Sequence, residues 1–314
     1  MMAESAQKKD LTVVIPAYDE RESLAELLRR LDAVIQPLGL SYEIIVIDDG
    51  SNDGSSELLR ELRGTHPALR YVEFQRNFGK SAALAVGFAR ARGDVVITMD
   101  ADLQDDPAEI PSLMAKLDEG FDLVSGWKKE RKDPFIKNST SKLFNLVTSM
   151  SAGLRLHDFN CGLKAYRREV TESLRVYGEM HRYLPLLAHV MGFRVTEIPV
   201  RHQPRQFGET KFGRSRFLNG MLDLFTVLFL TRQRSSPLHF FGRVGLAFGT
   251  LGSGICLYFF WVWIDAGALR LRPLLLLGIA LILVALQFIS LGLLAELFVA
   301  SRDNQSHIQI RSEG

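Results

Sequence analysis

The sequence predicts an α/β domain with a mainly parallel sheet, followed by two helices long enough to cross a membrane. Apolar runs of strand length alternate with amphipathic helical patterns over roughly the first 200 residues, which is typical of a parallel sheet covered on both faces. Carboxylate-rich clusters follow several of these runs. The last part of the chain holds two apolar stretches without charge, 244–264 and 274–295, and a spanning helix needs about 20 residues.

The strands are expected where short apolar runs end in turn-forming residues. The run at 11–18 is interrupted by Pro16, and the leucines after it are spaced as on one face of a helix over 19–31. An alanine-rich helical stretch follows Ser81 and ends near Gly93. The pattern repeats, with strands expected at 11–18, 42–47, 69–74, 94–99, 121–125 and 194–200, and further helices at 55–63, 107–119 and 163–174.

The fourth strand ends in Asp100-Ala101-Asp102-Leu103-Gln104, and Pro107 begins the next helix. Ligands of open α/β sheets bind at the carboxyl ends of the strands, where carboxylates hold Mg²⁺ or Mn²⁺ together with substrate phosphate oxygens. The alternative is an acidic turn followed by a helix cap. Because the first two strands also end in polar clusters, Ala17-Tyr18 and Asp48-Asp49, we favour a binding site. Asp105-Asp106 are expected to act only as negative charge at the helix N-terminus.

Composition and motifs exclude several classes of function. The 38 basic and 36 acidic side chains nearly balance, so nothing calls for nucleic acid. Cys161 and Cys256 lie far apart and provide neither a disulfide framework nor zinc-ligand spacing. Gly79-Lys80-Ser81 lacks the upstream glycine of a Walker phosphate loop, and no G-x-G-x-x-G sequence is present. The polar residues 1–10 contain no signal peptide, and a reducing compartment is expected.

Two segments rich in Lys and Arg interrupt the α/β pattern. A solvated surface is the usual role of such a run of charges. The first segment, however, directly follows the carboxylate clusters, where a role in binding phosphate is equally well motivated. The basic residues of the two segments are Lys128, Lys129, Arg131, Lys132, Lys137 and Lys142, and Arg201, Arg205, Lys211, Arg214 and Arg216.

The C-terminal part is predicted to enter the membrane. An apolar helix over 217–229 with flanking arginines suits the membrane interface, and a core helix of the soluble domain is the alternative. The excess of Arg and Lys before the first span predicts a multi-pass protein of the inner, or plasma, membrane with the large domain and both termini cytoplasmic. The expected divisions are a polar tail (1–10), the α/β domain (11–212), a juxtamembrane amphipathic segment (213–236), a two-helix transmembrane domain (237–300) and a cytoplasmic tail (301–314).

Small residues in the first span predict helix–helix contacts in lipid. We therefore expect a homo-oligomer formed through the transmembrane helices. Gln287 in the second span is expected either to hydrogen-bond to another helix or simply to be tolerated. The small residues are Gly245, Gly249, Gly252 and Gly254.

Three motifs occur together at characteristic spacing: Val-Ile-Pro-Ala-Tyr-Asp-Glu at 14–20, Val-Ile-Asp-Asp-Gly-Ser at 46–51 and Asp-Ala-Asp-Leu-Gln at 100–104. Together they resemble the inverting glycosyltransferases of family 2, which have the Rossmann-like GT-A fold. Asp158-x-x-Cys161-Gly162-x-Lys164-Ala165-Tyr166-Arg167 and the segment 205–211 resemble one branch, the polyprenyl-phosphate sugar transferases. That branch includes dolichol-phosphate mannose synthase and bacterial undecaprenyl-phosphate glucosyltransferases.

The resemblance implies roles for individual residues. Asp158 and Asp102 would be catalytic, with Asp158 beside the anomeric carbon; the alternative for Asp158 is an N-cap of the following helix. The metal, Mg²⁺ or Mn²⁺, would be held by Asp100, Asp102 and Gln104. The nucleotide sugar would contact Pro16, Ala17, Tyr18, Glu20, Asp48, Asp100, Ala101, Asp102 and Gln104, and the acceptor phosphate would contact Arg131, Lys137, Ser141, Arg205 and Lys211.

The resemblance implies a membrane-bound hexosyltransferase of the polyprenyl-phosphate β-glucosyltransferase type. Its donor would be UDP-glucose and its acceptor undecaprenyl or another polyprenyl phosphate. The same reaction with GDP-mannose or another nucleotide sugar is the first alternative, and a non-catalytic, membrane-tethered scaffold that binds nucleotide sugars is the second. Polymer synthesis is not expected, because no Gln-x-x-Arg-Trp signature occurs: Gln203 is followed by Pro204-Arg205-Gln206-Phe207.

Overall fold

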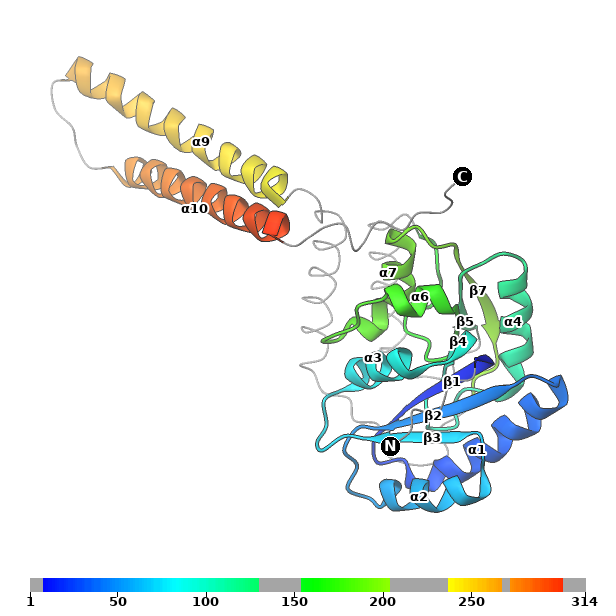
Figure 1. The fold of residues 1–314 in the computed structure, drawn as a ribbon. Coiled ribbons are helices and arrows are strands. Elements are labelled where there is room, and N and C mark those ends of the chain that lie inside the picture. Colours follow the sequence, from blue (N-terminus) through cyan, green and yellow to red (C-terminus); the bar gives the residue numbers. More distant parts are fainter. Residues whose placement is uncertain (1–7, 130–153, 204–236, 267–271, 302–314) are drawn as a thin grey trace. The chain divides into compact units, whose positions relative to one another are not determined.

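The structure is a computed structural model that describes residues 8–129, 154–203, 237–266 and 272–301 (Figure 1). Its contacts divide the chain into two compact units, Met1–Leu228 and Phe229–Gly314. Each unit is described by itself below. The finer division expected from the sequence stays a prediction.

The first unit is built on one seven-stranded sheet with the order β3-β2-β1-β4-β6-β5-β7. Strands β1 to β4 are parallel, β6 runs antiparallel to both of its neighbours, and β7 is parallel to β5. The strands are β1 Lys9–Ala17, β2 Tyr42–Asp48, β3 Leu69–Glu73, β4 Gly93–Thr98, β5 Leu123–Lys128, β6 Lys164–Arg167 and β7 Val195–Val200. The six expected strands are confirmed, with shifted ends.

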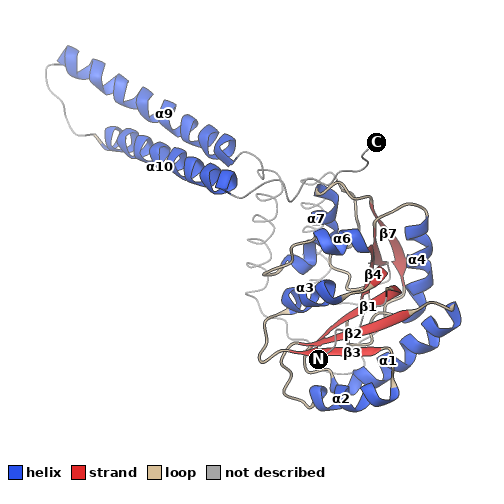
Figure 2. Ribbon diagram, in the orientation of Figure 1, coloured by secondary structure: helices blue, strands red, loops and turns tan. Residues whose placement is uncertain are grey.

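Helices cover both faces of this sheet (Figure 2). One face packs against α1, α2 and α4, and the other against α3, α6 and α7. The helices are α1 Arg21–Ile35, α2 Ser55–Thr65, α3 Lys80–Arg90, α4 Ile110–Asp118, α6 Arg168–Ser173 and α7 Leu184–Val190, with short 3-10 turns at η1 Gln36–Leu38, η2 Pro107–Glu109 and η3 Met180–Tyr183.

The prediction of a helix over 163–174 is wrong for its first part. Residues Lys164–Arg167 form β6, which pairs with β4 on one side and β5 on the other, and only Arg168–Ser173 are helical. Lys164, Ala165 and Tyr166 are buried. A strand inserted between two others gains ladder hydrogen bonds and burial on both faces, and this tertiary context overrides a local helical pattern.

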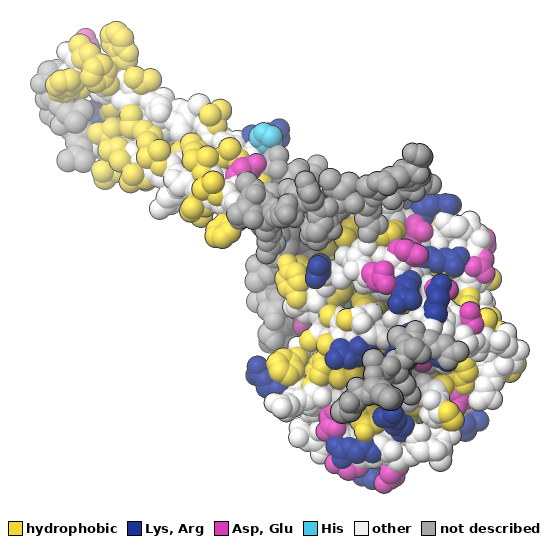
Figure 3. Space-filling view, viewed as in Figure 1, with side chains coloured by type: hydrophobic (Ala, Val, Ile, Leu, Met, Phe, Trp, Pro, Cys, Tyr) yellow, Lys and Arg dark blue, Asp and Glu magenta, His cyan; other side chains and the backbone are white. Residues whose placement is uncertain are grey.

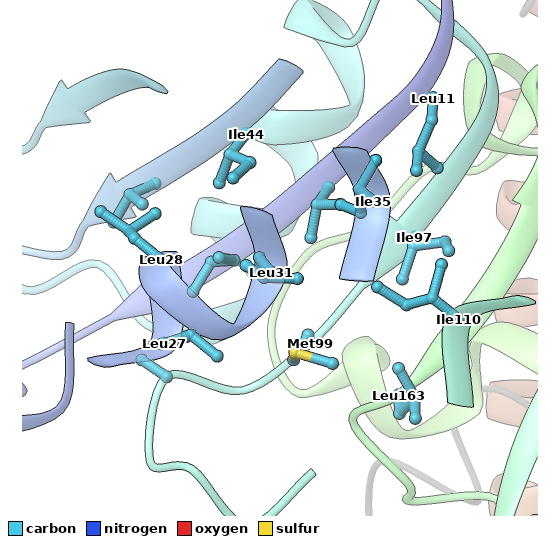
Figure 4. Packing of buried hydrophobic residues seen from close by; sticks show 14 of the residues in the cluster. Leu11, Leu27, Leu28, Leu31, Ile35, Ile44, Ile97, Met99, Ile110 and Leu163 are labelled. Carbon is cyan, nitrogen blue, oxygen red and sulfur yellow. The ribbon is translucent and has the colours of Figure 1, made fainter. Parts of the chain in front are cut away.

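The alternation of side chains along β1 explains the two cores. Leu11, Val13 and Ile15 point to the face covered by α1, whereas Val14 belongs to the core under α3. Figure 4 shows the leucines of α1 packed on this side of the sheet. Both faces of the central strands are therefore apolar, which leaves the strand ends as the places where polar groups can gather.

A buried polar network joins the first four strands toward their amino ends. Glu43 is 3% exposed and accepts hydrogen bonds from the hydroxyl of Thr12 (2.9 Å), the backbone N–H of Arg92 (2.8 Å) and the guanidinium of Arg70 (2.6 Å). The Thr12 hydroxyl oxygen in turn accepts the N–H of Gly93 at 2.8 Å. One carboxylate thus satisfies donors from three different segments.

The second unit is a hairpin of two long apolar helices, α9 Pro237–Ala266 and α10 Pro273–Ser301. By length and composition, Pro237–Asp265 and Pro273–Phe298 are candidate membrane spans. Figure 3 shows hydrophobic side chains over the visible face of both helices. Large exposed side chains include Leu246, Leu257, Trp261, Leu283, Leu297 and Phe298.

Gly245, Gly249 and Gly252 of α9 contact α10 of the same hairpin, and the expected homo-oligomer stays a prediction. A Cβ on Gly252 would lie 2.7 Å from the carbonyl oxygen of Gly278, and one on Gly245 would lie 2.9 Å from Ile289. Gly249 faces Ala285 in the same way, whereas a Cβ on Gly254 would meet nothing within 4 Å. Close approach of two helices in lipid needs such small residues, and here the partner is α10 of the same chain.

Glu43→Ala should lower the free energy of unfolding by about 2 kcal/mol, because the buried Thr12 hydroxyl and the Arg70 guanidinium lose the carboxylate that accepts their hydrogen bonds. The change in melting temperature of the detergent-purified protein measures this effect. Glu61→Ala, at an exposed position of α2, is the matched control and should melt like the wild type. Equal melting temperatures for the two variants would contradict the role of Glu43.

Candidate active site

The loops after β1 and β2 are tied together at the carboxyl edge of the sheet. The backbone N–H of Asp19 donates to the Ser51 hydroxyl (2.9 Å), and the N–H of Asn52 donates to the Asp19 carboxylate (3.0 Å). Asp19 has a φ of 55°, a conformation in which aspartate is one of the more tolerated non-glycine residues. The cross-link fixes Pro16, Ala17, Tyr18 and Glu20 beside the end of β2.

Asp48 and Asp49 are buried and engaged in holding loops. Asp48 accepts hydrogen bonds from the N–H of Ser51 (3.0 Å) and from the hydroxyl groups of Ser51 and Ser56. Asp49 accepts the N–H groups of Phe78 (2.7 Å) and Gly79 (2.9 Å), and burial raises the pKa of its carboxyl. Both side chains order the edge of the site. The contact of Asp48 with the nucleotide sugar stays a prediction.

Asp100 lies at the centre of the site, directly after β4. Its carboxylate forms an ion pair with the ammonium group of Lys80, the first residue of α3. Burial alone would raise the pKa of Asp100, but the charges of Lys80, Lys128 and Lys164 outweigh burial and lower this pKa to about 2. Asp100 is therefore ionised at every physiological pH.

The turn after Asp100 is fastened at several points. Asp102 accepts the N–H of Gln104 at 3.2 Å, and the carbonyl oxygen of Gln104 accepts the N–H of Gln203 at 2.9 Å. Leu103 is 1% exposed and has a φ of 60°, a left-handed conformation that is costly for leucine and needs support from its surroundings. Ala101 is buried as well.

The two aspartates after this turn differ in role. Asp106 caps η2 by accepting the N–H of Ala108 at 3.0 Å, so the expectation of a helix-terminal charge is confirmed for it. For Asp105 the expectation is wrong. Its side chain is fully buried and forms an ion pair with Lys128 at 3.0 Å. The segment after β7 forms a β-bridge from His202 to Asp105, and this segment helps to shield Asp105 from solvent.

The residues at this turn fit a divalent cation shared with a phosphate ligand. In the described parts of the chain, no group of three His, Cys, Asp or Glu side chains is placed to hold a metal alone. Asp100 is ionised and Asp102 is two residues away on a partly exposed turn. One or two carboxylates with the remaining positions filled by phosphate oxygens and water is the usual donor set for Mg²⁺.

The loop that carries Asp158 packs directly against Asp100. A Cβ on Gly162 would lie 2.6 Å from the carboxyl carbon of Asp100, so no larger residue fits there without movement. The Thr98 hydroxyl donates to the carbonyl oxygen of Gly162 at 2.8 Å, and the Lys164 ammonium donates to the carbonyl oxygen of Cys161. These contacts bring the loop 158–162 onto the end of β4.

The alternative role of Asp158 as a helix N-cap is wrong, because β6 and not a helix follows. Asp158 is 2% exposed, and its carboxylate accepts the N–H of Asn160 at 3.1 Å. This local turn leaves the loop compact, with Asn160, Cys161 and Gly162 lining a pocket that also contains Asp100.

Sequence reasoning did not assign Lys80, Lys164 or His181 to the site, yet all three line the same pocket. Burial lowers the pKa of the Lys164 ammonium group, and burial also lowers the pKa of His181. His181 is held through its ring Nδ1, 3.0 Å from the Ser81 hydroxyl. A lysine at the first position of a helix that follows a sheet edge is a signal that could have identified Lys80.

Five expected site residues lie outside the described residues. They are the residues assigned to the acceptor phosphate by resemblance: Arg131, Lys137, Ser141, Arg205 and Lys211. Their role stays a prediction. The expected metal and nucleotide residues, by contrast, are all described and lie at the carboxyl ends of β1, β2 and β4 or on the loops that follow them.

The chain is similar to proteins of known activity over nearly its whole length. It is 38% identical over 308 residues to the dodecaprenyl-phosphate galacturonate synthase of Rhizobium johnstonii, covering 96% of this chain and 91% of that protein. It is 40% identical over 295 residues to the undecaprenyl-phosphate 4-deoxy-4-formamido-L-arabinose transferase of Klebsiella pneumoniae, covering 92% of this chain and 88% of that protein.

Solved structures confirm the expected GT-A fold. Glucosyl-3-phosphoglycerate synthase from Mycobacterium tuberculosis, in complex with phosphoglyceric acid, superposes with a TM-score of 0.53 at 20% identity, covering 71% of this chain and 80% of that chain. The same enzyme has been solved with Mn²⁺, UDP and glucosyl-3-phosphoglycerate, with a TM-score of 0.51. The family model for glycosyl transferase family 2 matches residues 12–175, and with the relatives above this shows that the chain belongs to that family.

Proposed function

We propose that this protein transfers a glycosyl group from a nucleotide sugar to a polyprenyl phosphate at the membrane. The observation that carries the proposal is the packing of the Asp158 loop on Asp100 at the carboxyl edge of the sheet. The relatives, which are named as polyprenyl-phosphate sugar transferases, and the two candidate membrane spans support it.

Asp100 and Asp102, with Gln104, would hold a divalent cation against the donor diphosphate. That cation would neutralise the diphosphate and stabilise the departing nucleoside diphosphate. A family 2 structure that contains Mn²⁺ with UDP supports a divalent cation in general. Lys80, at the positive N-terminus of α3, adds a second cation at the same place.

The acceptor needs little activation. A phosphate monoester has a second pKa of about 6, so it is mostly dianionic at neutral pH. The protein must instead bind that dianion. The basic segments would bind it through Arg131, Lys137, Ser141, Arg205 and Lys211. Arg205 follows Gln203 by two residues, and Gln203 is bonded to the Asp100–Gln104 turn. Asp158 would orient the acceptor or take a proton from its singly protonated form.

The donor sugar is the part of the proposal that the relatives change. The sequence-based expectation was glucose from UDP-glucose. Relatives at 38% and 40% identity are named for galacturonate and for 4-deoxy-4-formamido-L-arabinose. We therefore place a uronic acid or a formamido pentose ahead of glucose, and GDP-mannose behind all three.

Membrane placement follows from the acceptor. Moving a polyprenyl tail out of the bilayer costs roughly 0.8 kcal/mol of free energy per CH₂. The transfer reaction must therefore take place at the membrane surface. We propose the plasma membrane, with the catalytic unit and both termini cytoplasmic. Self-association stays a prediction. Gly254 and Gln287 are two exposed positions on the hairpin that suit contact with another helix.

Purified protein should move label from a nucleotide sugar into undecaprenyl phosphate in the presence of Mg²⁺ or Mn²⁺. The donors to compare are UDP-galacturonate, UDP-4-deoxy-4-formamido-L-arabinose, UDP-glucose and GDP-mannose. We expect one of the first two to exceed UDP-glucose at least about tenfold in kcat/KM, a difference of about 1.4 kcal/mol. Binding of a nucleotide sugar without label in lipid for any donor would instead support the non-catalytic scaffold.

Asp102→Ala should reduce transfer at least about 100-fold, because the cation loses a carboxylate ligand and with it several kcal/mol of charge stabilisation. Mn²⁺ binding in the presence of UDP, measured by calorimetry, should weaken in parallel. Asp118→Ala, at an exposed position of α4, is the matched control. Undiminished turnover of Asp102→Ala would refute the metal role, and membrane insertion should be unchanged in both variants.

Asp158→Asn should lower kcat by a factor of about 10² to 10⁴, the usual range for a group that moves or orients a proton. Asparagine keeps an oxygen to accept the N–H of Asn160, so the loop should stay folded. Affinity for UDP should remain within twofold of the wild type. Transfer at the wild-type rate would remove Asp158 from the catalytic residues.

A further inference from the structure

Glu197, a residue of β7, accepts hydrogen bonds from the backbone of the loop that carries Asp158. The Glu197 carboxylate accepts the backbone N–H of His157 at 2.8 Å and the backbone N–H of Asp158 at 3.4 Å, and it also contacts the Nδ1 atom of the His157 ring. Its side chain is 12% exposed. One nearly buried carboxylate thus engages two consecutive backbone groups of the catalytic loop.

The chemistry of these contacts assigns the hydrogen atoms. When Glu197 is ionised it only accepts hydrogen bonds, and the tautomer of His157 that carries its hydrogen on Nδ1 then fits this contact. The ring of His157 also stacks on Trp127, with centroids 4.1 Å apart and planes 17° from parallel. Trp127 belongs to β5, which pairs with β7. The His157 side chain, which is 65% exposed, therefore contacts one side chain from each of two neighbouring strands.

Two sets of hydrogen bonds hold the loop 157–162, one at each end. Thr98 and Lys164 hold the carbonyl groups of Gly162 and Cys161 from β4 and β6. Glu197 holds the N–H groups of His157 and Asp158 from β7. Asp158 lies at the Glu197 end, where its backbone would be left without this anchor if the carboxylate were removed.

We propose that Glu197 is a positioning residue that sets the place of the Asp158 carboxylate in the transfer reaction. It acts through the backbone of the loop and through His157, and it does not itself touch a substrate. The inference rests on the proposed function, because it needs Asp158 to be catalytic. A misplacement of about 1 Å costs on the order of 100-fold in rate.

The test measures kcat, KM and UDP affinity for Glu197→Ala and Glu197→Gln. We expect kcat to fall about 100-fold in Glu197→Ala, with KM for the donor and affinity for UDP within twofold. Glutamine retains one acceptor oxygen, so Glu197→Gln should recover part of the rate. Glu169→Gln, at an exposed position of α6, should match the wild type. If Glu197→Ala does not fold, Glu197→Gln alone is compared with the wild type, and its kcat should fall while its KM and UDP affinity stay within twofold.

A second measurement separates positioning from general structural damage. In the Asp158→Asn background, Glu197→Ala should lower kcat by less than a further threefold. The carboxylate that Glu197 positions is already absent in this background. A full, multiplicative loss in the double variant would overturn the inference, as would equal losses in kcat and UDP affinity. Failure of the wild type to label any lipid would instead overturn the proposed function, so the two failures are distinguishable.

Discussion

The close contact between Gly162 and Asp100 is the constraint on which the site depends. Two loops from opposite chain directions, one after β4 and one before β6, meet with no room for a Cβ between them. Antiparallel β6 makes the meeting possible, because its amino end lies beside the carboxyl end of its neighbour β4. A fully parallel sheet would deliver the second loop to the opposite edge. The single reversed strand thus places Asp158 with the carboxylates after β4.

Charge around this contact is arranged in pairs. Asp100 faces Lys80, and Asp105 faces Lys128 in a buried pair behind the turn. Buried ion pairs add little net stability, because desolvation offsets attraction, but losing one partner is strongly unfavourable. The pairs keep the acidic turn compact before any ligand arrives. A diphosphate with its cation, as proposed, would enter a site in which Lys80 already faces Asp100.

Sequence patterns predicted the fold well where a signal was local. Apolar runs ending in Asp48-Asp49 and Asp100-Ala101-Asp102 identified strands and their functional edge, and two uncharged stretches identified the hairpin. Pairing partners leave no such local signal, so the sequence placed Lys164–Arg167 in a helix. It also did not show that Gly245, Gly249 and Gly252 contact the second helix of the same hairpin. Glu197 was missed for the same reason, since only the folded sheet brings it to the loop that carries Asp158. The sugar specificity was not readable from the motifs, which describe the diphosphate and not the group attached to it.

The hydrogen bond from Gln203 to Gln104 has a thermodynamic consequence. It joins the carboxylate turn to Gln203, which lies between Arg201 and Arg205 of the second basic segment. A ligand that reshapes the turn must move Gln203 with it or break a backbone bond. Binding at the turn and the placement of the chain beyond Gln203 are then linked equilibria, and linkage is reciprocal. If the acceptor binds to that segment, as proposed, the donor would strengthen acceptor binding by the same factor by which the acceptor strengthens donor binding.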